Sequence, residues 1–254
     1  MALLAGGLPA LALARPPADP VVIVVNTGSG GLALLTDPDG RWLAIGGSTA
    51  RTGAAVALDR QLPAWERSLG LLLVPPPHAA HVPGALEILD RRSVGRASLL
   101  GLSPRPQAAL ERWAARRSAE PVTAPAEVAL AGGGRLWLDP GDDPSGGGAL
   151  ALIERGEVRL LLLFGEAAAL AETRHVAGRL PRPLVAGQLT RAATPLPTGL
   201  SPALLLTLDG AGAVGPPRTL ALGAGQTIRL TLQPDRLRLE GEMIESSVAV
   251  SRAR

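Results

Sequence analysis

The stretch that decides the fold is LLLVPPPHAAHVPG, residues 71–84. An apolar run of strand type ends at Val74, three prolines follow, and His78 and His81 then stand three residues apart before Gly84. Because the whole chain has only three histidines, two of them close together after a buried strand form a candidate metal site. The structural alternative is that both side chains cap the following helix or face solvent.

Strands and helices alternate on both sides of this stretch. The β-branched run VVIVVNT predicts a buried strand, and a DPDG turn between two apolar runs predicts a hairpin. Pro63 is expected to end or kink the helix before the histidine strand. The elements predicted for the first half are strand 21–27, a hairpin around 37–40, helix 52–67, strand 69–74, helix 84–91, strand 97–102 and an amphipathic helix over 106–119.

The second half repeats this order. A hairpin turns at Arg155-Gly156-Glu157, a helix is predicted over 166–180, short strands follow, and 218–242 forms three alternating strands joined by Gly-Ala-Gly and Gln-Pro-Asp turns. Two β-rich halves, each covered by helices, predict an α/β (α+β) fold: a four-layer αββα sandwich. Since no long linker interrupts residues 21–254, we expect one domain there.

The first twenty residues are mostly apolar up to Arg15, but they are too short for a full bilayer span of roughly 20 apolar residues. Gly6, Gly7 and Pro9 also interrupt the run. Three interpretations stay open: a signal peptide with an Ala12-Leu13-Ala14 cleavage site, the remnant of a membrane helix, and a tail.

The charge of the chain is modest. All 25 basic side chains are arginine, 22 are acidic, and the formal net charge is +3. Arg91, Arg92 and Arg96 flank one predicted helix end. The strongest candidates for nucleic-acid contact are Arg112, Arg116 and Arg117 on the helix over 106–119, since Arg112 and Arg116 share one helix face.

Five motifs in this order resemble the metallo-β-lactamase fold, and within it the C-terminal domain of ComEC-type DNA-internalisation competence proteins. VNTGSGGL (25–32) matches the family's opening L-D-V-G-Q-G-D-A, and TDPDGRWLAIGGS (36–48) matches a hairpin that ends in I-D-G-G. PPPHAAHVPG (75–84) matches the metal motif T-H-x-H-x-D-H-x-G-G. VRLLLLFGE (158–166) matches a strand ending in G-D, and AGQLTR (186–191) matches an H-H-G-S loop.

The resemblance also shows which ligands are missing. It places Pro76 and Ala80 on a histidine and the aspartate of the metal motif and Gly46 on the aspartate of I-D-G-G, and neither histidine of the H-H-G-S loop is kept. His78, His81 and Glu166 match the remaining metal positions. We therefore expect no resident cofactor, or one Zn²⁺ or Mn²⁺ ion at most. The structural alternative for Glu166 is a carboxylate at a helix N-terminus, where the helix dipole favours it.

The function expected from the resemblance is a catalytically degenerate domain of a competence system. It would have a structural or DNA-contacting role, membrane-associated or extracytoplasmic, with DNA and a membrane channel subunit as partners. The alternative is a hydrolase, a phosphodiesterase or nuclease, with a rebuilt single-metal site. A third is an interaction module that does not contact DNA. The oligomeric state is not predicted.

Overall fold

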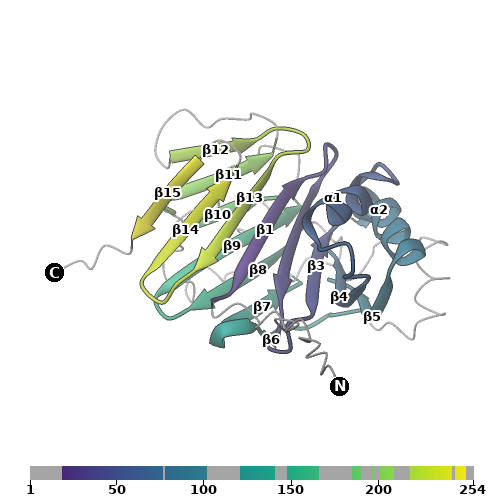
Figure 1. Ribbon diagram of the computed structural model, residues 1–254, viewed down its shortest axis with the longest axis horizontal. Helices are drawn as coiled ribbons and strands as arrows, with labels where there is room; N and C mark the ends of the chain where they lie inside the picture. Colours follow the sequence, from purple (N-terminus) through teal and green to yellow (C-terminus); the bar gives the residue numbers. More distant parts are fainter. Residues whose placement is uncertain are drawn as a thin grey trace, which may run out of the picture.

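A computed structural model describes residues 19–76, 78–101, 121–140, 148–165, 185–189, 196, 201–208, 218–241 and 244–249. In these ranges two β-sheets lie face to face, and helices α1 (Gly53–Gln61) and α2 (His78–Arg91) cover part of the outer face of the first sheet (Figure 1). The predicted sandwich of two mixed sheets is confirmed.

The two sheets contain all the described strands. The eight-stranded sheet has the order β15 (Ile244–Ala249), β14 (Arg236–Gly241), β13 (Thr227–Leu232), β1 (Val21–Asn26), β2 (Gly31–Thr36), β3 (Trp42–Gly46), β4 (Ser68–Val74) and β5 (Ser93–Leu99). The seven-stranded sheet has the order β12 (Arg218–Leu222), β11 (Leu204–Leu208), β10 (Val185–Gln188), β9 (Val158–Gly165), β8 (Gly148–Arg155), β7 (Arg135–Asp139) and β6 (Ala126–Ala129).

The two halves share one pattern of strand pairing. In the first, β1, β2 and β3 pair antiparallel, and β3, β4 and β5 then pair parallel. In the second, β6 to β9 pair antiparallel and β9 to β12 pair parallel. Parallel neighbours need a crossover connection. In the first half these crossovers are α1 and α2, and the repeat expected from the sequence is confirmed.

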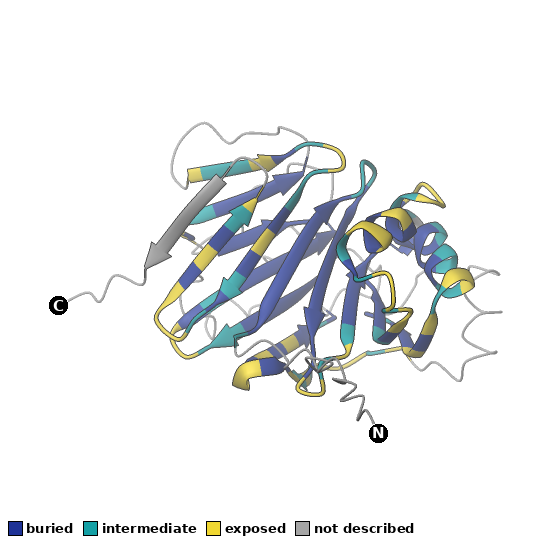
Figure 2. Cartoon of the chain, viewed as in Figure 1, coloured by how far each residue is buried: buried dark blue, intermediate teal, exposed yellow. Residues whose placement is uncertain are grey.

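The position of β1 between two packed layers explains why its sequence is apolar at nearly every position. Val22 and Val24 face the second sheet, whereas Val21, Ile23 and Val25 face the helices. Both faces are buried, and each such side chain stabilises the fold by about 1.5–3 kcal/mol. β13 is different, because Arg229 lies exposed between buried Ile228 and Leu230 (Figure 2). Helix α1 reaches only the start of this strand, where Gln61 donates to the Thr227 hydroxyl at 3.1 Å.

Pro63 ends α1, as expected. Leu62 before it is extended at φ −94° and ψ 145°, the conformation that a following proline favours. The helix therefore stops at Gln61 and does not reach residue 67. The predicted start of the next helix at residue 84 is wrong, because α2 begins at His78. The stripe His81, Val82, Ala85 and Ile88 is buried along the helix face that packs on the sheet.

Two strands were not predicted, and two predicted helices cannot be compared. β6 is short and partly exposed, and β15 follows the three predicted C-terminal strands. The Gly-Ala-Gly turn carries the chain from β12 in one sheet to β13 in the other. The predicted helices over 106–119 and 166–180 lie outside the described residues. Leu161 and Leu163, on the outer face of the second sheet, are buried nonetheless, as a fourth layer requires.

Candidate metal site

His78 and His81 lie in the first turn of α2 rather than in a loop. The turn begins four residues after the end of β4, so both histidines lie near the carboxyl end of a strand that has parallel neighbours on both sides and is second from the edge of its sheet. Being three residues apart on a helix, they share one face. His78 is 3% exposed and His81 is 1% exposed. The solvent-facing alternative is therefore excluded for both side chains.

His78 is held by a hydrogen bond to the backbone. Its Nε2 lies 3.2 Å from the carbonyl oxygen of Leu100, the residue after β5. A carbonyl can only accept, so Nε2 carries the proton. Burial lowers the pKa of His78, and the Leu100 carbonyl opposes that lowering. The bond ties the first turn of α2 to the end of β5, which is a structural use of the imidazole.

His81 is the unusual residue of the site. Neither of its ring nitrogens forms a hydrogen bond of normal geometry with a described residue. Burial is the main reason that its pKa is lowered to about 4; the nearby His78 lowers it further, and the backbone of Gly47 opposes the shift. The ring is therefore neutral at physiological pH. A buried polar group without a partner is costly, by about 1–3 kcal/mol.

Glycines enclose His81 on the side of β2 and β3. A Cβ atom at Gly30 would lie 3.6 Å from the His81 ring carbon Cε1, and one at Gly47 would lie 2.9 Å from the His81 carbonyl carbon. Gly84 lets Ser48 approach α2, since its N–H donates to the Ser48 carbonyl at 2.9 Å. Gly30, Gly31, Gly46, Gly47 and Gly84 together are called the glycine frame.

Gly46 takes the place where the resemblance puts an aspartate. Its φ is +123°, which disfavours any side chain, and an added Cβ would lie 3.1 Å from the Gly31 carbonyl carbon and closer still to its oxygen. The backbone of β2 therefore fills the space that an aspartate side chain would need at this position.

The end of β10 is closed in a similar way. Gln188 and Leu189 stand where the family has its H-H-G-S loop, and Leu189 is fully buried. Gly31 donates its N–H to the Leu189 carbonyl at 3.1 Å. A Cβ at Gly31 would lie 2.7 Å from the Leu189 Cβ. An aliphatic side chain thus packs against the glycine frame from the second sheet.

Two buried polar residues near the ends of β1 and β3 were not predicted from the sequence. Asn26 is fully buried; its amide donates to the Leu222 carbonyl at 2.6 Å, and its Oδ1 accepts the Gly28 N–H at 2.8 Å. Ser48 is also buried, with its hydroxyl 2.7 Å from that of Ser29. An Asn at a strand end before glycines was the available signal for Asn26; none existed for Ser48.

The described residues around His78 and His81 supply two imidazoles and no carboxylate to a candidate metal centre. A catalytic zinc site takes three protein ligands and an open position. Within the described ranges no three His, Asp or Glu side chains come close enough to hold an ion, and one of the two histidines is engaged by Leu100. Glu166, the third predicted ligand, lies outside the described residues, as do Arg112, Arg116 and Arg117.

Comparison with known proteins bears on the fold. No family model matches the chain, and no curated protein sequence matches it at a significant level. A metallo-β-lactamase fold protein of Bacillus subtilis, YhfI, aligns over 83% of this chain and 100% of that one, with a TM-score of 0.51 and 11% identity. The chain has the metallo-β-lactamase fold. At this identity the likeness concerns the fold alone, so the ComEC-type resemblance stays a prediction.

Proposed function

We propose that the chain is a non-hydrolytic metallo-β-lactamase-fold domain of a ComEC-type DNA-uptake system, with a structural or DNA-contacting role. The observation that carries this proposal is the packing at Gly46. There, and again at Leu189, positions that match an aspartate and the H-H-G-S loop of the family are taken up by backbone and aliphatic contacts. Such packing stabilises the edge where the family performs its chemistry.

A membrane channel subunit is the proposed partner, and a membrane-associated or extracytoplasmic position is the proposed location. Both rest on the resemblance, in which the domain accompanies membrane helices. In the described part of the chain no helix is long and apolar enough to cross a bilayer.

One observation favours the alternative, a hydrolase with a rebuilt single-metal site. The unpartnered nitrogens of His81 are the kind of buried group that a metal ion would satisfy. His78, His81 and Glu166 would hold such an ion, and a bound cation would polarise a phosphate and activate water. His78 would keep its proton on Nε2, where Leu100 holds it.

Metal retention separates the two proposals. The full chain is incubated with excess Zn²⁺ or Mn²⁺, dialysed, and assayed for bound metal, with His81→Phe as the matched control. The non-hydrolytic proposal expects the same trace metal in both proteins and no cleavage of single- or double-stranded DNA. One equivalent that His81→Phe loses, together with DNA cleavage, would establish the hydrolase instead.

DNA contact is tested separately by equilibrium binding of single- and double-stranded oligonucleotides over a range of salt concentrations. Contacts to phosphates release counterions, so affinity is expected to fall as salt rises. Failure of the chain to bind either form at low salt would remove the DNA-contacting role and leave a structural one.

A further inference from the structure

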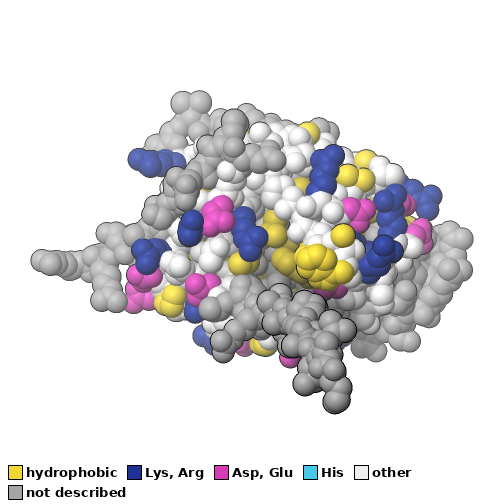
Figure 3. Space-filling model, viewed as in Figure 1, with side chains coloured by type: hydrophobic (Ala, Val, Ile, Leu, Met, Phe, Trp, Pro, Cys, Tyr) yellow, Lys and Arg dark blue, Asp and Glu magenta, His cyan; other side chains and the backbone are white. Residues whose placement is uncertain are grey.

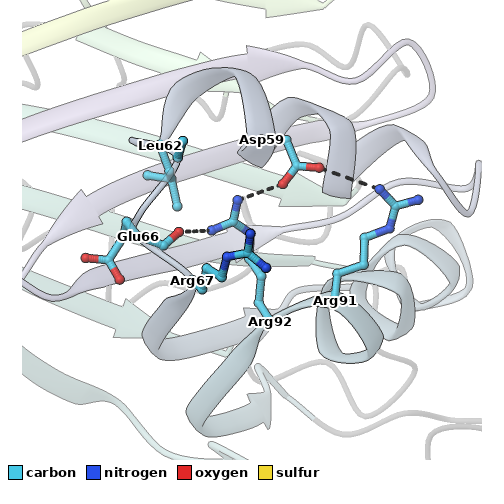
Figure 4. A pocket seen from close by; sticks show the side chains of 7 residues that line it. Asp59, Leu62, Glu66, Arg67, Arg91 and Arg92 are labelled. Atoms are coloured by element: carbon cyan, nitrogen blue, oxygen red, sulfur yellow. Dashed lines mark hydrogen bonds and ion pairs between the residues drawn. The ribbon is translucent and has the colours of Figure 1, made fainter.

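A charged hollow lies at the opposite end of α2 from the histidines. It measures about 510 Å³ and is lined by Asp59, Leu62, Glu66, Arg67, Arg91 and Arg92, with Ala64 at its wall (Figure 4). We call it the arginine hollow. A helix of 14 residues is about 20 Å long, so the hollow is separate from the candidate metal site.

Arg92 is fixed in this hollow. Its guanidinium donates to Asp59 Oδ1 at 2.7 Å and to the Glu66 carbonyl at 2.5 Å, and its side chain is only 8% exposed. Arg91 lies 3.5 Å from the other Asp59 oxygen. A guanidinium has five N–H donors, and the described partners of Arg92 use two of them. A rigid arginine with donors to spare is suited to an oxyanion.

Arg67 adds an unpaired charge. Its side chain lines the hollow and forms no hydrogen bond or ion pair with any other residue that the structure describes. The Glu66 carboxylate is occupied by Ser68, through its N–H at 3.1 Å and its hydroxyl at 2.7 Å. Two carboxylates, Asp59 and Glu66, face these guanidinium groups in the lining, and Arg91 is also paired with Glu87 at 2.6 Å. The lining therefore holds three guanidinium groups and two carboxylates, and Arg67 supplies the positive charge that no described residue pairs.

Trp65 lies in the sequence between Ala64 and Glu66, two residues that line the hollow. It is 83% exposed, whereas the other large exposed apolar side chains of the described ranges, Val56 and Trp137, reach 37% and 38%. Trp and Arg are the residue types most enriched where partners bind tightly. An indole in water beside spare guanidinium donors offers a flat apolar face next to an anion site.

We propose that this corner binds a nucleotide unit of single-stranded DNA, with a phosphate in the arginine hollow and a base stacked on Trp65. The guanidinium fork matches phosphate geometry, and indole rings stack on bases of any sequence. The choice of DNA as the source of the nucleotide rests on the DNA-contacting role proposed above.

The surrounding charges limit the length of the contact. Figure 3 shows arginines interleaved with acidic side chains over α1 and α2. Arg51, for example, is paired with Glu87 and Asp90, each at 3.4 Å. A long polyanion would meet these carboxylates along α2, whereas one or two nucleotides at the arginine hollow would meet fewer of them.

The test measures binding of a labelled short oligo-dT to the full chain by fluorescence anisotropy, at several salt concentrations. The test variants are Trp65→Ala and Arg67→Ala, both at exposed side chains. The matched controls are Trp137→Ala and Arg135→Ala, a second exposed Trp and Arg pair on one face of β7. Melting temperatures close to wild type establish that all four variants fold.

Trp65→Ala is expected to weaken binding by roughly 5- to 100-fold, the range for loss of one stacked base. Arg67→Ala is expected to reduce the slope of log affinity against log salt by about 0.7, the value for one phosphate contact on a single strand. The β7 variants should bind as wild type does.

If Trp65→Ala and Arg67→Ala bind oligo-dT as tightly as wild type, the subsite is overturned and the DNA-contacting role stands. The same follows if the β7 variants lose as much affinity for oligo-dT as these two variants do. Competition by free dTMP without binding of the strand would reject DNA as the source. Trp65-dependent binding of an acidic peptide in preference to oligo-dT would replace the nucleotide with a protein partner. No binding of oligo-dT to wild type would overturn both the subsite and the DNA-contacting role.

Discussion

The two ends of α2 treat polar side chains in opposite ways. At its first turn, His78 and His81 are almost completely buried, and the glycine frame excludes solvent from His81. At its last turn, Arg91 and Arg92 form charge pairs beside an open hollow. Residue type alone suggests chemistry at the histidine end. Packing instead encloses the histidines at that end, whereas the arginine end borders an open hollow.

The largest expected effect comes from breaking the glycine frame. Gly46→Asp restores the family's residue type, but it places a side chain at positive φ against the Gly31 carbonyl. We expect a loss of about 4 kcal/mol in the free energy of unfolding, from backbone strain plus overpacking. Urea denaturation measures it.

The matched control is Gly133→Ala. Gly133 has a φ of +77° and no atom within 4 Å of an added Cβ, so it carries strain without a clash. It should lose only about 1 kcal/mol. If Gly46→Asp keeps wild-type stability, the glycine frame accommodates a side chain at this position and is not rigid.

The next effect is the pH dependence of the histidine end. The folded-state pKa of His81 is lowered from 6.5 to about 4, so the unfolded chain binds the proton more tightly. The stabilising contribution is present above pH 6.5 and is lost as pH falls toward 4. It amounts to about 3 kcal/mol for this group. Denaturation of wild type and His81→Phe across this range isolates it, because only wild type should show the added slope.

Replacing each histidine by phenylalanine sharpens the comparison within the first turn. His81→Phe removes a buried group without a partner, so stability should stay the same or rise by about 1 kcal/mol near neutral pH. His78→Phe leaves the Leu100 carbonyl without its donor and should cost about 1–2 kcal/mol. Thermal unfolding compares them. A larger loss in His81→Phe than in His78→Phe would mean that His81 has a ligand.

The smallest effect is expected at the arginine end. Asp59→Asn weakens the pairs with Arg91 and Arg92. The side chains of Asp59 and Arg91 are partly exposed, and buried Arg92 keeps its bond to the Glu66 carbonyl, so the loss of stability should stay under about 1 kcal/mol. Denaturation at low and high salt should show that the difference from wild type shrinks as salt rises. A loss independent of salt would mean that Asp59 is needed for packing.

Much of the fold followed from local patterns. The continuous apolar run at Val21–Asn26 indicated a strand buried on both faces, the DPDG turn gave a hairpin, and Pro63 stopped α1. β15 was missed, and the start of α2 was placed too late. The Pro83-Gly84 pair suggested a boundary, whereas Gly84 donates its N–H to Ser48 and the helix continues through it.

The candidate site was only partly visible. His78 and His81 were found because histidines are rare in this chain, but their burial was not predicted. The hydrogen bond from His78 to Leu100 joins residues 22 positions apart. The contact between Gly31 and Leu189 joins the two sheets. Such pairings depend on how strands dock, and no local pattern encodes them.

The sequence by itself determined the order of most described strands and helices. Apolar alternation, turn residues and prolines each act on structure within a few positions along the chain. Only the tertiary structure decided what the polar residues do. Burial lowers the pKa of His81, which the glycine frame encloses. The C-terminal end of α2 and the segment between α1 and β4 form the arginine hollow, in which Arg67 and Arg92 lie. Desolvation and cavity shape arise from elements distant in the chain, which is why docking of the sheets and helices had to be known.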